Sequence, residues 1–385
     1  MTDIYLDNSA TTRPYREVLE LMGMVQAESY GNPSSMHEKG LAAEKLIREA
    51  RRQIAAMIGG RDHEIVFTSG GTEANNLAIK GAAFHYRRKG AHLITSAIEH
   101  PSVLNCFRFL EQEGFKVSYL PVSAKGIVDP DFVKSLIGKD TLLISIMHVN
   151  NETGSIQLLE EIGRGIKKIN PEILFHIDAV QSFTRLPLKL KEWQADLVSL
   201  SAHKIHGTKG AGCLWIKQGV KLQPLLDGGG QEKGLRAGTE NVAAIAGFGL
   251  AAKLSGENQN KKMAVVGDLK KAFYSAIQNS GINCILNGPL LEESAPHIIN
   301  LSFPGLKSEV LLHSLEEQGI YVSAGSACHS RHPEPSHVLS AMGLSGKTLD
   351  GALRFSFSVL NNEEEVAAAT EATINTVRHL SALIR

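Results

Sequence analysis

Short apolar runs alternate with longer stretches of helical periodicity over the first two thirds of the chain. The runs have the length of buried strands and fall at residues 64–68, 92–96, 117–120, 142–146, 173–177, 197–200 and 212–216. Helical patterns lie between most of them, and another precedes the first run at 41–58, where apolar residues recur on one face until two glycines end the pattern. This alternation predicts a large, mostly parallel sheet covered by helices on both faces, with ligands at the carboxyl ends of its strands.

The pattern changes after a helix predicted at 242–254. A polar run at 255–262 is interpreted as a hinge between domains, and a chain of 385 residues suits two of them. Helices are expected near 265–278, at 308–318 and at 363–383, and strands at 297–303, 320–323 and 353–357. We therefore predict a large α/β domain over 15–255 and a small α+β domain formed by 1–14 and 256–385.

Charge and cysteine usage narrow the possible partners. Forty basic and forty acidic residues leave no net charge that would draw the chain to nucleic acid or to a membrane surface. The N-terminus lacks the pattern of a signal peptide, and no apolar run has membrane-spanning length. The four cysteines form no CxxC pair, which argues against disulfides and structural zinc. We expect a cytoplasmic protein without a metal, in which Cys106, Cys213 and Cys284 are buried.

Polar residues follow several of the predicted strands. The strand at 64–68 leads into Gly71 and Thr72 at the start of a helix, a layout in which backbone N–H groups and the helix dipole hold a phosphate. A plain turn capped by Thr72 would explain the same residues. Further polar segments end four other strands, at 99–102, 147–154, 178–181 and 201–204. Since such strand ends meet at one edge of a sheet, they indicate a built site.

One of these strand ends carries a lysine. Lys204 could form an imine with a carbonyl compound if its neighbours lower its pKa, although an ordinary solvated loop lysine is the alternative. Asp178, at the preceding strand end, could keep a pyridine nitrogen protonated, or could form a capping box with Gln181. With Gly71 and Thr72 for a phosphate and His100 as a possible ring-stacking group, the set favours a pyridoxal-phosphate site.

The sequence resembles the NifS/IscS-like cysteine desulfurases of the class V aminotransferase superfamily, which have pyridoxal-phosphate fold type I. The resemblance covers most of the chain. It rests on motifs in the same order at residues 5–12, 31–37, 68–76, 149–154, 176–182, 201–204, 235–241 and 323–328.

The resemblance implies a role for each residue of the cofactor site. Pyridoxal 5'-phosphate would form an imine with Lys204, pair its ring nitrogen with Asp178, and bond its ring oxygen to Gln181. His100 would stack on the ring and move protons. The phosphate would be bound by Gly71, Thr72, Ser201 and His203 and by Thr239 from a second subunit, which implies a homodimer.

The substrate site follows from the same resemblance. Asn151, which is also expected to contact the cofactor, and Arg354 would hold the carboxylate of L-cysteine, a task suited to a guanidinium fork. Two departures from the family pattern leave the subfamily and the turnover rate open. Residues 358–360 read Ser-Val-Leu where Gly-Arg-Phe is usual, and His329 replaces a common threonine.

The fourth cysteine, Cys328, lies in a loop of small and polar residues at 323–336. His329, Arg331 and His332 would favour its thiolate if they lie close to it. A structural buried cysteine and a metal site that adds His337 to Cys328, His329 and His332 are the alternatives.

The resemblance implies that Cys328 takes sulfur from L-cysteine as a persulfide, leaving L-alanine. A mobile loop would then deliver the sulfur to an acceptor, such as an iron–sulfur scaffold protein, or to thio-cofactor or tRNA biosynthesis. An aminotransferase, a selenocysteine lyase and a non-catalytic docking protein remain alternatives, and the acceptor and any activity on selenocysteine stay open.

Overall fold

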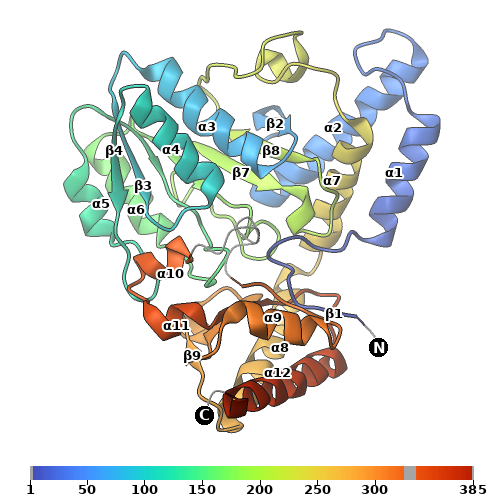
Figure 1. The fold of residues 1–385 in the computed structure, drawn as a ribbon. Helices are drawn as coiled ribbons and strands as arrows, with labels where there is room; N and C mark the ends of the chain where they lie inside the picture. The colour runs from blue at the N-terminus through green and yellow to red at the C-terminus, as the bar shows by residue number, and fades with distance from the viewer. Residues whose placement is uncertain (1–2, 325–334, 384–385) are drawn as a thin grey trace.

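A seven-stranded sheet forms the centre of the larger part of the molecule (Figure 1). The structure is a computed structural model and describes residues 3–324 and 335–383. The strand order is β2-β8-β7-β6-β5-β3-β4, and β8 runs antiparallel to the other six strands. The strands are β2 Ile65–Thr68, β3 His92–Ser96, β4 Lys116–Leu120, β5 Thr141–Ser145, β6 Leu174–Asp178, β7 Leu197–Ser201 and β8 Gly212–Ile216. The apolar runs therefore predicted the sheet correctly.

Helices cover both faces of this sheet because alternate strand residues point to opposite sides. Phe67 and Ile144 pack in the core beneath the first group of helices, whereas Val66 and Leu143 pack beneath the second. The first group comprises α1 Arg16–Glu28, α2 Glu38–Ile58, α5 Pro130–Leu136, α6 Leu159–Ile169 and α7 Val242–Gly256, and the second comprises α3 Gly71–Tyr86 and α4 Pro101–Gln112. Burial on both faces explains why the strands read as continuous apolar runs.

A second core lies in the smaller part of the molecule. Its sheets are β12-β10-β9, which is antiparallel, and the parallel pair β1-β11. The elements are β1 Ile4–Tyr5, α8 Gln259–Asn279, β9 Ile285–Leu286, β10 Ile298–Ser302, α9 Ser308–Glu316, β11 Ile320–Tyr321, α10 His337–Ala341, α11 Gly346–Asp350, β12 Ala352–Ser356 and α12 Glu363–Leu383. Ile4 and Leu6 belong to this core, together with Phe273 and Phe355. The exact domain boundaries stay a prediction.

The polar run at 255–262 is mostly helical, and its interpretation as the hinge between domains stays a prediction. Helix α7 continues to Gly256 and α8 begins at Gln259, with only Glu257 and Asn258 between them. Lysine and glutamine are good helix formers, and polar composition does not distinguish an exposed helix from a loop. Among the described residues, no helix is both long and apolar enough to span a membrane.

Candidate active site

The carboxyl edge of the large sheet brings the predicted cofactor residues together. Asp178 ends β6 and Ser201 ends the neighbouring strand β7. Gly71 opens α3 after β2, and a Cβ atom built on it would lie 3.6 Å from that of Ser201. His100 follows β3 and is the N-cap of α4. The chain order of strand, polar turn and helix therefore places these side chains at one edge.

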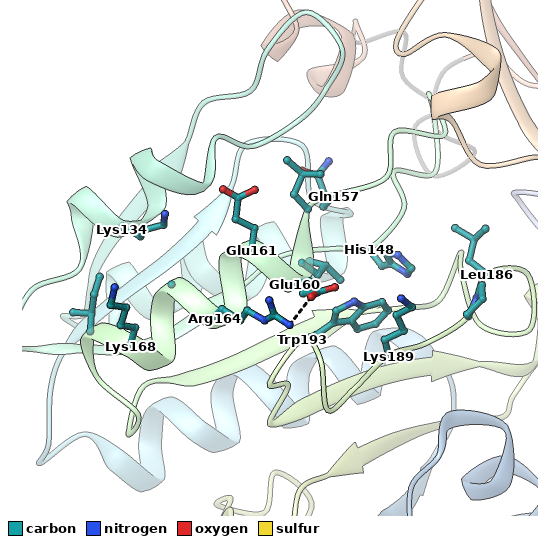
Figure 2. A pocket seen from close by; sticks show the side chains of 15 residues that line it. Lys134, His148, Gln157, Glu160, Glu161, Arg164, Lys168, Leu186, Lys189 and Trp193 are labelled. Atoms are coloured by element: carbon teal, nitrogen blue, oxygen red, sulfur yellow. Dashed lines mark ion pairs between the residues drawn. The ribbon is translucent and has the colours of Figure 1, made fainter.

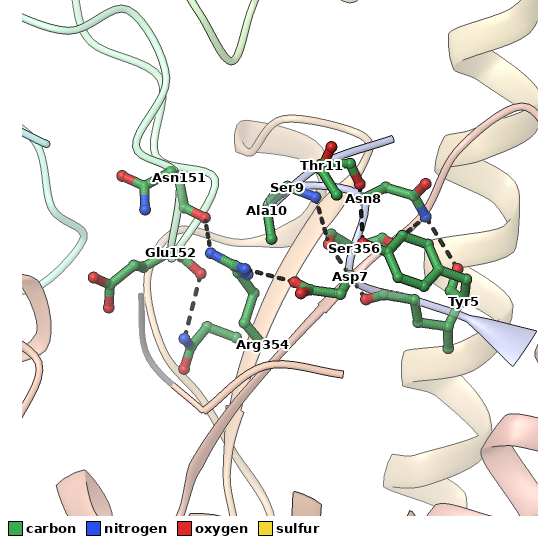
Figure 3. Close-up of polar contacts among 12 residues, drawn as sticks. Tyr5, Asp7, Asn8, Ser9, Ala10, Thr11, Asn151, Glu152, Arg354 and Ser356 are labelled. Atoms are coloured by element: carbon green, nitrogen blue, oxygen red, sulfur yellow. Dashed lines mark hydrogen bonds and ion pairs between the residues drawn. The ribbon is translucent and has the colours of Figure 1, made fainter. Parts of the chain in front are cut away.

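Lys204 ends a short 3-10 turn, Ala202–Lys204, directly after β7. Its Nζ donates to the backbone carbonyls of Ser9 at 2.5 Å and Ala10 at 2.7 Å. These carbonyls belong to the N-terminal segment, residues 5–12, which continues from β1 (Figure 3). Arg185 donates to the Lys204 carbonyl at 2.6 Å. The lysine is therefore half-buried and held by backbone contacts, unlike a solvated loop lysine.

Asp178 is buried and accepts two hydrogen bonds. The Val180 N–H donates to Oδ1 at 3.0 Å, and the Asn75 Nδ2 donates to Oδ2 at 2.8 Å. Burial raises the pKa of Asp178, while these two hydrogen bonds and the charge of Lys204 act in the opposite direction. The side chain of Gln181 donates to the Ser9 carbonyl at 2.9 Å, so the capping box considered for Asp178 and Gln181 does not form.

The residues predicted to hold a phosphate fit an anionic group. The buried Oγ of Ser201 has no hydrogen-bond partner among the described residues. A Cβ atom at Gly71 would come within 2.8 Å of Val180 Cγ2, so only glycine lets the start of α3 lie this close to Val180. Burial and the nearby charge of Lys204 lower the pKa of His203 to about 3, which keeps its ring neutral. An unpartnered hydroxyl beside a helix N-terminus is a suitable phosphate site.

His100 and Thr72 line one hollow of about 310 Å³ in front of this edge. The Ser102 N–H donates to His100 Nδ1 at 3.2 Å, and the Ser102 hydroxyl lies 2.8 Å from the same nitrogen. Thr239 is exposed on the loop before α7, and no hydrogen bond between described residues joins it to the site. Its predicted contribution from a second subunit stays a prediction.

Arg354 reaches the site from β12 and is fully buried (Figure 3). Its Nη1 donates to the Asn151 carbonyl at 3.0 Å, and its Nη2 donates to Asp7 Oδ1 at 2.6 Å. The buried Nε has no partner among the described residues. The structure thus brings both predicted substrate residues together, through the backbone of Asn151, and adds Asp7 as an ionic partner.

Cys328 lies outside the described residues, as do His329, Arg331 and His332. The described residues on either side of it are held at the site. Ser323 forms a backbone bridge with Arg354 on β12. On the other side, Ser336 Oγ donates to Glu152 Oε2 at 2.5 Å, and His337 Nε2 lies 3.0 Å from the Glu99 carbonyl.

Several polar groups of the site were missed from the sequence. The carbonyls of Ser9 and Ala10 carry no side-chain signature, and Asp7 was quoted only as part of a motif. Asn75 follows Thr72 in another quoted motif and was given no role. Arg185, whose pKa burial lowers to about 10, has no signal in the sequence at all.

One predicted strand-end residue lies elsewhere. His148 lines a separate cavity of about 1030 Å³ beside α6, against Trp193 (Figure 2). Burial lowers the pKa of His148 to about 3. None of the predicted site residues lines this cavity, so His148 lies apart from the site, whereas Asn151 of the same segment contacts Arg354.

Comparisons with known proteins agree with this geometry. The sequence profile of the family described as aminotransferase class-V matches residues 4–368. The cysteine desulfurase IscS of Dictyoglomus turgidum is 44% identical over 364 residues, covering 94% of this chain and 92% of that protein. The putative cysteine desulfurase IscS 1 of Bacillus subtilis is 44% identical and covers 99% of this chain and 100% of that protein.

Solved structures show the same fold. A NifS-like protein superposes with a TM-score of 0.92 at 38% identity, covering 99% of this chain and 100% of that one. A structure described as SspA in complex with cysteine superposes with a TM-score of 0.81 at 36% identity, covering 94% of this chain and 100% of that one.

Proposed function

The chain belongs to the aminotransferase class-V family and is a cysteine desulfurase of the IscS/NifS type, and on that premise we propose that it uses pyridoxal 5'-phosphate and passes sulfur to Cys328. The family, fold class and desulfurase activity expected from the sequence are confirmed. The observation that carries the cofactor assignment is the placement of Lys204, buried Asp178 and the unpartnered Ser201 hydroxyl at the carboxyl ends of the neighbouring strands β6 and β7.

The protein has a residue suited to bind each part of the cofactor. Lys204 would bind its carbonyl carbon, and Asp178 would accept from its protonated ring nitrogen. The remaining contacts would come from Gly71, Thr72, His100, Asn151, Gln181, Ser201 and His203, with Thr239 of the partner subunit. When bound, pyridoxal phosphate supplies an electron sink for negative charge at the substrate Cα.

The protein side chains would bind the substrate and move its proton. Arg354 would exchange its contact with Asp7 for the carboxylate of L-cysteine. Its buried guanidinium would donate two parallel hydrogen bonds to the two carboxylate oxygens. The Nζ of Lys204, once released from the carbonyls of Ser9 and Ala10, would take the Cα proton.

Sulfur transfer requires a nucleophile, and the resemblance assigns this role to Cys328. The thiolate would attack the substrate sulfur, so that a sulfur–sulfur bond forms and the carbon–sulfur bond breaks. The electron pair stays with the carbon, which is protonated to give L-alanine. The net reaction converts L-cysteine and the Cys328 thiol into L-alanine and a Cys328 persulfide. The anchoring of Ser323 and Ser336 at the site supports this role.

We also propose a homodimer that hands sulfur to an acceptor protein in the cytoplasm. The apolar side chains of Tyr30 and Met36 are exposed between α1 and α2, which is typical of an interface. The described cysteines, Cys106, Cys213 and Cys284, are unpaired, as a reducing compartment would keep them.

Turnover of L-cysteine by the purified protein tests this function. Equal amounts of alanine and sulfide are expected in the presence of a thiol reductant. Cys328→Ala should keep the cofactor absorbance and bind cysteine but release no sulfide, whereas Cys284→Ala should behave as the unchanged protein. Absence of alanine would favour a docking protein over an enzyme, and sulfide release by Cys328→Ala would exclude Cys328 from the reaction.

A further inference from the structure

Asn75 lies at the centre of a hydrogen-bonded chain that no predicted role explains. It is almost fully buried on α3. Its Nδ2 donates both to Asp178 Oδ2 at 2.8 Å and to Ser102 Oγ at 2.9 Å, while its Oδ1 has no partner among the described residues. Ser102 Oγ in turn lies 2.8 Å from His100 Nδ1. These hydrogen bonds therefore link Asp178, the carboxylate expected at the ring nitrogen of the cofactor, to His100, the imidazole expected to stack on the cofactor ring.

The donor and acceptor of each hydrogen bond in this series follow from the groups at its two ends, Asp178 and His100. An ionised carboxylate only accepts, so Asn75 must turn its amide nitrogen toward Asp178. The second hydrogen of that nitrogen goes to Ser102 Oγ. The single hydrogen of the hydroxyl is then left for His100 Nδ1, which also accepts from the Ser102 N–H at 3.2 Å. A proton on Nδ1 would face both donors, so the ring proton belongs on Nε2.

We propose that Asn75 is a positioning residue that holds Asp178 as a carboxylate and, through Ser102, fixes His100 in the tautomer protonated at Nε2. The proposal rests on the proposed function, because it is the cofactor nitrogen that calls for an ionised Asp178. In this tautomer neutral His100 presents an N–H and no lone pair at Nε2. His100 then donates to the substrate or cofactor, and the base that takes the Cα proton is Lys204.

The substitution Asn75→Asp tests the chain because it replaces one nitrogen by oxygen at almost constant volume. The new carboxyl group would share one proton with Asp178, but its oxygen can still accept, so the Ser102 hydroxyl should turn its hydrogen toward it. His100 Nδ1 would then lose the hydroxyl donor and keep only the Ser102 N–H at 3.2 Å. The result expected is a mixture of the Nε2–H and Nδ1–H tautomers of His100 in place of the single Nε2–H form. The paired carboxylates should also change the visible absorption of the bound cofactor.

The tautomer can be read directly by nitrogen NMR of the holoenzyme labelled with ¹⁵N-histidine, with His100 assigned by the loss of its signals in His100→Gln. The unchanged protein should show a protonated Nε2 and an unprotonated Nδ1. Asn75→Asp should give signals of both tautomers and lower kcat about tenfold or more with little change in KM. Asn170→Asp is the matched control, because the Asn170 Oδ1 only accepts from the Glu172 N–H and an aspartate can do the same.

Ser102→Ala provides a second variant should Asn75→Asp fail to fold. It removes the hydroxyl link but leaves Asn75 on Asp178, so a mixture of His100 tautomers is expected with unchanged cofactor absorbance. A protonated Nδ1 in the unchanged protein, or a wild-type tautomer in both variants, would overturn the proposal. A protein that forms no adduct at Lys204 would instead contradict the proposed function, while the tautomer of His100 could still be measured.

Discussion

The guanidinium of Arg354 is buried with Asp7 on one side and the Asn151 carbonyl on the other. Lysine cannot form the fork that a carboxylate matches, so Arg354→Lys should raise KM for L-cysteine by roughly tenfold or more, equivalent to about 1.5–3 kcal/mol of charged hydrogen bonding. Steady-state kinetics measures this. Arg378→Lys, on the exposed side of α12, should leave KM unchanged, and an unchanged KM in Arg354→Lys would remove Arg354 from the substrate site.

Glu99 is a second residue whose environment predicts a measurable effect. Burial raises its pKa to about 8, although Ser96 and the Met147 N–H both donate to its Oε1. Between its ordinary pKa and 8 the folded protein keeps a proton on Glu99 that the unfolded chain releases. Stability should therefore fall as pH rises through this range, by at most about 1.4 kcal/mol per pH unit.

The substitution Glu99→Gln isolates this effect. Glutamine keeps the accepting oxygen and carries no titrating proton. The free energy of unfolding of the variant should therefore decrease less between pH 5 and pH 8 than that of the unchanged protein. Denaturant titrations at several pH values measure the difference, with the exposed Glu113→Gln as the control. Parallel pH profiles for Glu99→Gln and the unchanged protein would contradict the raised pKa.

At the scale of elements, the close approach of the start of α3 to Val180, in the turn after β6, depends on Gly71. An added Cβ would meet Val180 Cγ2 at 2.8 Å, so Gly71→Ala must displace the helix start. We expect weaker cofactor binding, by about tenfold, and a loss of roughly 1–3 kcal/mol in stability. Cofactor titration and denaturant unfolding measure these effects.

Gly23→Ala is the matched control for this substitution. Gly23 lies inside α1 with no atom close enough to meet a Cβ, so alanine should stabilise the protein by about 0.5–1 kcal/mol. Equal cofactor binding and stability of Gly71→Ala and Gly23→Ala would show that the position of α3 does not depend on a glycine at residue 71.

The elements themselves were largely predictable from the sequence. Strands buried on both faces carry continuous apolar runs, and the site residues Asp178, Ser201 and Lys204 follow from their positions at strand ends. The N-terminal segment was not predictable in the same way, because it acts through the carbonyls of Ser9 and Ala10, which every residue type possesses. The helical form of the polar run after α7 was not predicted, because an exposed helix and a loop share its composition.

At the scale of the whole molecule, the account requires two copies of the chain. The exposed Tyr30, 70% accessible, and the fully exposed Met36 should be covered in the dimer. Light scattering should therefore give twice the mass of one chain, and the double variant Tyr30→Asp with Met36→Asp should shift toward a monomer. Leu290→Asp, which changes an exposed apolar residue in the smaller part of the molecule, should leave the measured mass unchanged. A monomeric wild-type protein would contradict the contribution expected from Thr239.

The proposed function depends on Lys204 as the residue that carries the cofactor. Borohydride reduction of the purified protein, followed by peptide mapping, tests it most directly. The account predicts loss of the visible absorption band and a single pyridoxyl adduct on the peptide that contains Lys204, with no adduct in Lys204→Ala. An adduct on any other lysine, or a protein that carries no such cofactor, would contradict it.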